Sequence, residues 1–159
     1  LRSIAQTEAD VSSLDHWARR AVSPEEGDSY DVHVALRRAL AHLGRCYDQP
    51  VVLTELATLA GVSPSHLSAL FRSVVGAPFK SLLRHIRILK AREQLAADPA
   101  ASVTDVAFQV GFADLSYFER SFRRIVGQSP REFRRAAHRV APLATLSSFL
   151  SGSASDPAE

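Results

Sequence analysis

The stretch Val106-Ala107-Phe108-Gln109-Val110-Gly111-Phe112-Ala113 repeats, about fifty residues later, the pattern of Leu56-Ala57-Thr58-Leu59-Ala60-Gly61-Val62-Ser63. Downstream the two copies stay in step with one extra residue in the second: Leu67, Phe71, Arg72 and Gly76 correspond to Phe118, Phe122, Arg123 and Gly127. A short helix, a glycine turn and a longer helix with a cationic outer face are the parts of a helix-turn-helix, a hairpin that reads DNA. Two copies in one chain predict that one molecule reads two stretches of groove.

Composition sets the outer bounds of the prediction. With 159 residues, 46% of them hydrophobic, the chain is long enough for one domain plus tails. No apolar run approaches the roughly 18–20 residues needed to span a bilayer, and no signal-peptide pattern opens the chain, so we expect no membrane partner. The single cysteine, Cys46, excludes an internal disulfide and fits a reducing cytoplasm. Because the chain contains no methionine, we expect it to be a piece of a longer protein.

The net charge of +2 is unevenly distributed along the chain. Residues 31–139 hold 16 basic and 9 acidic side chains, a net of +7, whereas residues 1–30 hold 3 basic and 6 acidic ones. Positive charge on the part that carries the repeats fits a polyanionic partner. From charge alone, a solvated basic face without a partner fits equally well.

The spacing of apolar residues predicts an all-α fold with no convincing strand. The expected order is a helix over about 31–47, a first helix-turn-helix over about 53–76, a linker helix over about 79–97, a second helix-turn-helix over about 103–127 and a final helix over about 130–139. Thr54, Ser63, Ser102 and Asp114 are the expected N-caps. Residues 140–159, rich in Ser and Ala, are predicted to be a disordered tail.

Helical periodicity separates inner and outer faces of the two longer helices of the repeats. In the first, the predicted inward stripe is Leu67, Leu70, Phe71 and Val74, which leaves Ser65, Ser68, Ala69 and Arg72 outside. In the second it is Phe118, Phe122 and Ile125, which leaves Ser116, Glu119, Arg120 and Arg123 outside, with Leu115 near the helix start. Arg120 is the best candidate for a bidentate contact to guanine; an ordinary solvated helix face is the alternative for each of these residues.

The predicted linker helix has a length that matters for binding a duplex. A helix of about 18 residues is about 27 Å long, whereas successive major-groove faces are about 34 Å apart. With two helix widths added, a rigid linker places both repeats on one side of the duplex. Because it fixes a separation that straight DNA need not match, we expect bending or an imperfect fit.

The segment from Gly111 to Arg124, continued by Gly127-Gln128-Ser129-Pro130-Arg131-Glu132-Phe133-Arg134, resembles the C-terminal signature of the AraC/XylS family of bacterial transcription regulators. Residues Ser63 to Phe71 are similar to that family's first helix-turn-helix, and the resemblance covers about residues 31–138. It implies a seven-helix DNA-binding domain with two helix-turn-helix subdomains joined by a linker helix. It also implies a nucleoid-associated regulator, mostly of the activator type, that binds double-stranded DNA beside a promoter and contacts RNA polymerase. Many members carry a separate effector-binding or dimerisation domain, which here would lie in a region absent from this chain.

Carried over by position, the resemblance implies two sets of DNA contacts. Base contacts fall on Ser65, Ser68 and Ala69 in the first repeat and on Leu115, Ser116, Glu119 and Arg120 in the second. Phosphate contacts fall on Ser63, Arg72, Arg123, Ser129 and Arg131. The small side chains of the first repeat favour a helix that mainly holds the DNA backbone. Glu119 has two interpretations, an acceptor for a cytosine amino group or an ion pair with Arg123, and we favour the pair.

Residues 1–30 lie outside the resemblance and have three interpretations. They are a linker or remnant of an N-terminal regulatory region, a dimerisation helix, or an extra helix packed on the DNA-binding domain. The spacing of apolar residues over 3–21 predicts a helix there, with Trp17 in its core stripe.

Enzymatic readings find little support in the sequence. The six histidines are scattered without a metal-ligand pattern, no glycine-rich loop follows a strand, and Cys46 has no motif around it. We therefore expect no catalytic activity, no metal and no cofactor. The second function class is a helical protein-interaction module that binds an acidic partner, such as an RNA polymerase subunit.

Overall fold

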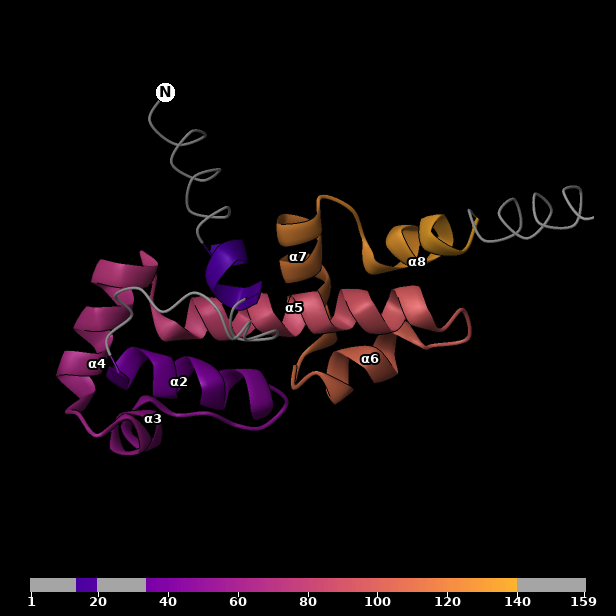
Figure 1. Cartoon of the computed structure of the whole chain (residues 1–159). Coiled ribbons are helices and arrows are strands. Elements are labelled where there is room, and N and C mark those ends of the chain that lie inside the picture. Colours follow the sequence, from indigo (N-terminus) through magenta and orange to yellow (C-terminus); the bar gives the residue numbers. More distant parts are fainter. Residues whose placement is uncertain (1–13, 20–33, 140–159) are drawn as a thin grey trace, which may run out of the picture.

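The computed structural model describes residues 14–19 and 34–139, and all regular structure in these residues is helical, which confirms the predicted all-α class (Figure 1). The greater part of the leading segment 1–30, the start of the helix expected over 31–47 and the tail predicted at 140–159 lie outside the described residues. Within the described ranges, no helix is at once long and apolar enough to cross a membrane.

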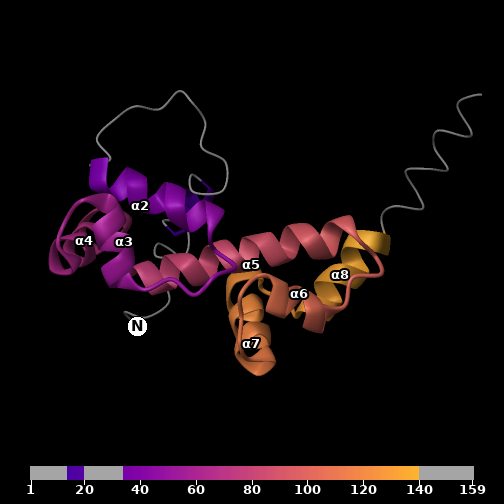
Figure 2. The same cartoon turned by 90° about the horizontal axis from the view of Figure 1, so that it is seen from below.

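Seven helices follow one another between residues 34 and 139. They are α2 (Val34–Arg45), α3 (Leu53–Ala60), α4 (Pro64–Leu70) with the π-helical turn η1 (Phe71–Val75), α5 (Phe79–Ala97), α6 (Val103–Gln109), α7 (Leu115–Val126) and α8 (Pro130–Arg139). Both views show α5 running through the middle of the molecule, with α2, α3 and α4 around its first part and α6, α7 and α8 around its second part (Figures 1 and 2). This is the expected pair of helix-turn-helix subdomains joined by a linker helix.

The linker helix α5 contributes to two separate hydrophobic cores. On one side of α5, Phe79, Leu82, Leu83, Ile86 and Leu89 pack with α2, α3, α4 and η1, whereas Ile88, Ala91 and Leu95 pack with α6 and α7. The first core is centred on Leu36, Leu56, Leu67 and Phe71, and the second on Phe118 and Phe122. Burial of such side chains contributes roughly 1.5–3 kcal/mol each, so α5 holds both subdomains in place through its packing.

The first helix-turn-helix is made by α3, a glycine turn and α4. Gly61 ends α3 with a φ of 77°, and the Ser63 hydroxyl accepts a hydrogen bond of 3.2 Å from the His66 N–H, with Pro64 as the first residue of α4. The Ser63 cap is therefore confirmed. The Thr54 cap is wrong: α3 already begins at Leu53, after an extended residue without a side-chain cap.

The end of the longer helix in the first helix-turn-helix, α4 with η1, departs from the predicted pattern. Its last turn, η1, is π-helical, which adds roughly one residue to that turn. Val75 is buried as a result, while Val74 is 36% exposed, so the prediction that Val74 points inward is wrong. A positive φ of 80° at Gly76 then ends the helix.

The second helix-turn-helix repeats the first with α6 and α7. The Ser102 hydroxyl accepts from the Asp105 N–H at 3.4 Å and caps α6, and Asp114 Oδ1 accepts from the Tyr117 N–H and caps α7. Both predicted caps are confirmed. Gly111 and Gly127, like Gly61 and Gly76 in the first copy, have positive φ angles of 91° and 86°.

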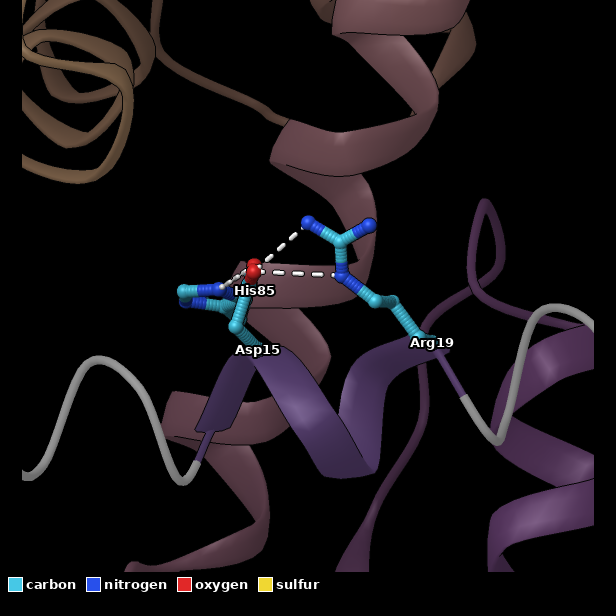
Figure 3. A network of polar contacts seen from close by, with 3 residues as sticks. All are labelled: Asp15, Arg19 and His85. Atoms are coloured by element: carbon cyan, nitrogen blue, oxygen red, sulfur yellow. Dashed lines mark hydrogen bonds and ion pairs between the residues drawn. The ribbon is translucent and has the colours of Figure 1, made fainter.

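Residues 14–19 form an extra helical segment, as expected within residues 3–21, and it packs on the first core, which matches one of the three interpretations of residues 1–30. Ala18 is fully buried there, and Leu14 and Trp17 pack against the same core. Asp15 Oδ1 lies 3.0 Å from His85 Nε2, on α5, and Asp15 Oδ2 accepts from Arg19 Nη2 at 2.7 Å (Figure 3). Because the His85 side chain is almost wholly buried, the segment supplies its polar partner.

The final helix α8 packs against the end of α5. His138 Nε2 lies 2.9 Å from the Leu95 carbonyl oxygen, and Arg134 donates to the Ala101 carbonyl. At its start, Ser129 and Glu132 form a capping box in which the Ser129 N–H donates to the Glu132 carboxylate at 2.8 Å. These contacts fix α8 to the end of α5 and to the segment that precedes α6.

Candidate nucleic-acid interface

The recognition helices α4 and α7 both cross the direction of α5, α4 at the end where α5 begins and α7 beside its middle (Figures 1 and 2). The apolar stripe of each helix packs into a core: Leu67 and Phe71 are fully buried in the first core, and Phe118 and Phe122 are fully buried in the second. Each begins at a side-chain cap. The arrangement leaves one long side of each helix, and its N-terminal end, facing solvent.

The outer face of α4 and η1 is small and polar. Ser65, Ala69 and Arg72 are exposed, and Ser68 is half-buried. Ser63 is exposed as well, with its hydroxyl engaged by the His66 N–H. Arg72 is the cation that this face offers, about two turns from the helix start at Pro64. Short side chains let a duplex backbone approach the helix closely, and an arginine beside them suits a phosphate.

The outer face of α7 carries the longer polar side chains. Ser116 and Arg120 are exposed, and Leu115 and Glu119 are half-buried. Arg123 and Arg124 are exposed in the last turn of the helix. A guanidinium on the N-terminal two turns of a helix is within reach of guanine O6 and N7 when the helix enters a major groove.

The ion pair that we favoured between Glu119 and Arg123 is wrong. Arg123 Nη2 instead lies 3.5 Å from the Glu132 carboxylate of α8, and both side chains are more than half exposed. An exposed pair of this length contributes little to stability and is readily exchanged for a phosphate. Glu119, without this partner, retains its carboxylate for a hydrogen-bond donor such as a cytosine amino group.

Ser129 and Arg131 were expected on phosphate and have different surroundings. The half-buried Ser129 uses its hydroxyl within the capping box, donating to Glu132 Oε2 at 2.6 Å. These hydrogen bonds hold the pKa of the Glu132 carboxyl below its ordinary value, so a negative charge lies beside Ser129. Arg131 is exposed. The geometry therefore disfavours Ser129 as a phosphate ligand and leaves Arg131 available.

Three polar residues that the sequence analysis did not single out lie where α5 meets the second repeat. Arg84 Nη1 donates to the Tyr117 hydroxyl at 3.0 Å, which ties α5 to the first turn of α7. Arg87 Nε donates to the Tyr47 carbonyl at 2.6 Å. A signal for Arg87 existed in the sequence, because an arginine between two isoleucines on a helix with two apolar stripes must be partly enclosed.

Known proteins share this arrangement. A family model described as a helix-turn-helix domain matches residues 56–136. The solved structure of a probable AraC family transcriptional regulator from Rhodopseudomonas palustris has a TM-score of 0.61 and 26% identity, covering 65% of this chain and 96% of its own. The chain belongs to the AraC/XylS family. The predicted resemblance is thereby confirmed.

Two further relatives of this AraC/XylS family member are informative. The transcriptional regulator GlxA of Rhizobium meliloti is 37% identical over 103 residues, which are 65% of this chain and 32% of GlxA. The DNA-binding domain of AdpA, a global transcriptional factor solved in complex with a target DNA, has a TM-score of 0.61 and 27% identity, covering 70% of this chain and 98% of that one. The chain spans about a third of the length of the GlxA relative.

Proposed function

We propose that this domain binds double-stranded DNA sequence-specifically and regulates transcription. The observation that supports it most is the presence of two helix-turn-helix units of the same build, each with a capped recognition helix and an exposed outer face, fixed to one helix. The similar domain of AdpA was solved with a target DNA. The excess of basic over acidic residues in positions 31–139 of this chain is opposite in sign to the charge of DNA.

In this proposal, α4 and α7 enter two adjacent major grooves on one side of the duplex. The 19-residue α5 is about 28 Å long. Since α4 lies at its start and α7 beside its middle, the span along α5 between the two recognition helices is shorter than this, against about 34 Å between successive major-groove faces. The difference favours DNA that bends toward the protein, and the bending energy makes the sequence between the half-sites matter although no residue contacts it.

The two recognition helices then have different tasks. The second reads bases through Arg120, with Glu119, Ser116 and Leu115 beside it. The first holds the backbone through Arg72 and through the amide groups around Ser63 and Ser65 at its N-terminus, while Ser65, Ser68 and Ala69 allow the close approach. Specificity resides mainly in the second half-site, and affinity is shared between the two.

An activator that contacts RNA polymerase is the form of regulation we propose, because it is common in the family. Leu59 and Phe108, on the first helices of the two units, are 52% and 53% exposed and offer apolar surface to a protein partner. In vitro transcription from a promoter with the bound site upstream tests this. The amount of RNA transcript should rise as this DNA-binding domain is added. A fall in product would identify a repressor instead.

The first experiment is selection of bound sequences from a random duplex pool, followed by affinity for the selected site at several salt concentrations. Enrichment of an asymmetric site over two adjacent major grooves, with affinity that falls steeply with salt, is the expected result. Absence of binding even at low salt would overturn the proposal and favour the helical protein-interaction module.

The longer proteins that this domain resembles leave room for further partners. We propose that a region outside this chain supplies an effector-binding or dimerisation function, and that the protein acts at the bacterial nucleoid. Comparing the selected site of this domain with that of the full-length protein tests the dimer, because a dimer selects a repeated site.

A further inference from the structure

The two helix-turn-helix units touch one another at a junction beside the middle of α5. Ile86 belongs to the first core and Ile88 to the second, so Arg87 stands where α5 passes from one to the other. Tyr47, after α2, packs partly against both cores. The junction is therefore more than a helix shared by two otherwise separate units.

The side chain of Arg87 joins three parts of the chain at this junction. Its Nε donates to the Tyr47 carbonyl at 2.6 Å and its Nη2 to the Gln49 carbonyl at 2.9 Å, both in the segment between α2 and α3. Its guanidinium carbon lies 6.0 Å from the centre of the Phe112 ring, in the turn of the second unit. Burial lowers the pKa of Arg87, and Asp48 and Tyr117 oppose that effect, so the two carbonyls serve a charged, partly enclosed group.

Gly111 brings the second unit against this clamp. A Cβ added at Gly111 would lie 2.6 Å from the Asp48 carbonyl oxygen and 2.9 Å from Arg87 Cζ. The glycine turn of the second helix-turn-helix thus packs directly on the segment that the arginine holds. Rotation of the first unit about α5 would break both carbonyl hydrogen bonds, and rotation of the second unit would separate Gly111 from Asp48 and Arg87.

The fork geometry explains why the junction uses arginine. A guanidinium presents two N–H groups in one plane at a fixed separation, and here they meet two different carbonyls of the same segment. A lysine ammonium has one nitrogen and cannot occupy both positions at once. Loss of the fork therefore loosens the junction without removing any recognition residue.

We propose that Arg87 is a positioning residue that fixes the angle between the two helix-turn-helix units and, through it, the number of base pairs between the two half-sites. The half-site part rests on the proposed function. One extra base pair moves the second half-site by about 3.4 Å and about 34°. A clamped junction rejects such a change, whereas a loose junction accommodates it.

The first measurement does not need DNA. Spin labels at Glu55→Cys on α3 and Thr104→Cys on α6, both exposed, in a Cys46→Ser background, report the distance between the units by pulsed electron resonance. We expect one narrow distribution in the protein with Arg87 and a broader one with Arg87→Lys or Arg87→Gln. Arg92→Ala, an arginine lost from the same helix, is the matched control and should stay narrow. Unchanged widths in both Arg87 variants, with helical content retained, overturn the proposal.

The second measurement uses the selected duplex with one or two base pairs added or removed between its half-sites. The protein with Arg87 should prefer one spacing by at least about tenfold, which corresponds to 1.4 kcal/mol, and the Arg87→Lys protein should lose most of that preference. The Arg92→Ala protein should keep the preference even if its overall affinity falls. A spacing preference that survives in Arg87→Lys contradicts the inference. If the protein with Arg87 binds no duplex, the proposed function is overturned, and with it the part of the Arg87 proposal that concerns half-site spacing. The spin-label distances still decide whether Arg87 couples the two units.

Discussion

Gly111 and Gly127 are residues with the same backbone and different surroundings. Their φ angles are 91° and 86°, and a Cβ at Gly111 would meet the Asp48 carbonyl at 2.6 Å, whereas one at Gly127 would meet nothing within 4 Å. A left-handed φ costs a side-chain-bearing residue roughly 1–2 kcal/mol, and overpacking typically 1–3 kcal/mol more.

The pair yields a stability prediction. Gly127→Ala should lower the free energy of unfolding by about 1 kcal/mol and Gly111→Ala by about 2–4 kcal/mol, as measured by urea denaturation followed by circular dichroism. Each variant is the other's control for strain in the backbone. Equal losses would mean that the contact with Asp48 adds nothing to the strain.

Substitution of Arg120 should reduce DNA sequence specificity more than substitution of any other proposed contact residue. Arg120→Ala should cost roughly 1–3 kcal/mol on the selected site and relax the preference at one base pair. Competition between the selected site and single-base variants measures this. Arg124→Ala, which removes a cation from the last turn of the same helix, should weaken all sequences alike. An equal loss on random DNA for Arg120→Ala would refute a base-reading role.

At the level of single residues, the sequence predicted what depends on local pattern. The caps at Ser63, Ser102 and Asp114 follow from short-range chemistry and are confirmed. The Arg123–Glu132 pair joins two consecutive helices, and the carbonyl partners of Arg87 lie about forty residues before it. No periodicity reveals such partners, because they depend on how the units pack.

Among the elements, the helical segment 14–19 depends on a contact that acid should weaken. Burial lowers the pKa of the His85 imidazole, with the nearby Arg84 and Arg19 charges adding to this and Asp15 opposing it. Burial acts to raise the pKa of the Asp15 carboxyl, but hydrogen bonds from His85 and Arg19 outweigh it and hold that pKa below its ordinary value. Both groups therefore bind protons less readily in the folded protein than in the unfolded chain.

The direction of the pH effect follows from these shifts. Below the ordinary histidine pKa of 6.5 the unfolded chain takes up a proton that His85 in the docked state resists, so docking weakens as pH falls. Asp15 adds to the loss at more acid pH. Trp17, the one tryptophan of the chain, packs on the first core, and its emission should shift to the red below pH 6.5.

A control is needed because His16 lies beside Trp17, with ring centres 5.4 Å apart. The titration should be carried out in a His16→Gln background, with His85→Gln as the comparison. The emission of the His85→Gln protein should stay constant between pH 7.5 and pH 5. A red shift of the same size in both proteins would show that His85 is not responsible.

At the same scale, the order and the type of the helices were predictable, and their ends less so. Strong apolar stripes specify α4, α5 and α7, which end before Gly76, Asp98-Pro99 and Gly127, whereas the π turn after Leu70 was not predicted. Its consequence, an exposed Val74 and a buried Val75, depends on packing in the first core and not on the propensity of either valine.

Over residues 14–19 and 34–139 the molecule has two cores that share a helix, and this should make unfolding cooperative. Leu95 is fully buried in the second core, and Leu95→Ala should cost about 2–5 kcal/mol. Because α5 and the Arg87 junction connect the cores, the midpoint from Trp17 fluorescence in the first core should fall together with the midpoint from circular dichroism. Leu82→Ala in the first core is the matched variant. If the unfolding midpoint from Trp17 fluorescence is the same with and without Leu95→Ala, the two units unfold independently.

The dual membership of α5 also restricts how this chain can change during evolution. Its first half closes one unit and its second half opens the next, so it acts as the last helix of one copy and the first helix of the other. Insertion of a single residue would advance the second copy by about 1.5 Å and turn it by about 100° around the axis. Surface loops can gain or lose residues one at a time, but descendants of this chain can alter the length of α5 only by nearly whole turns, three or four residues together.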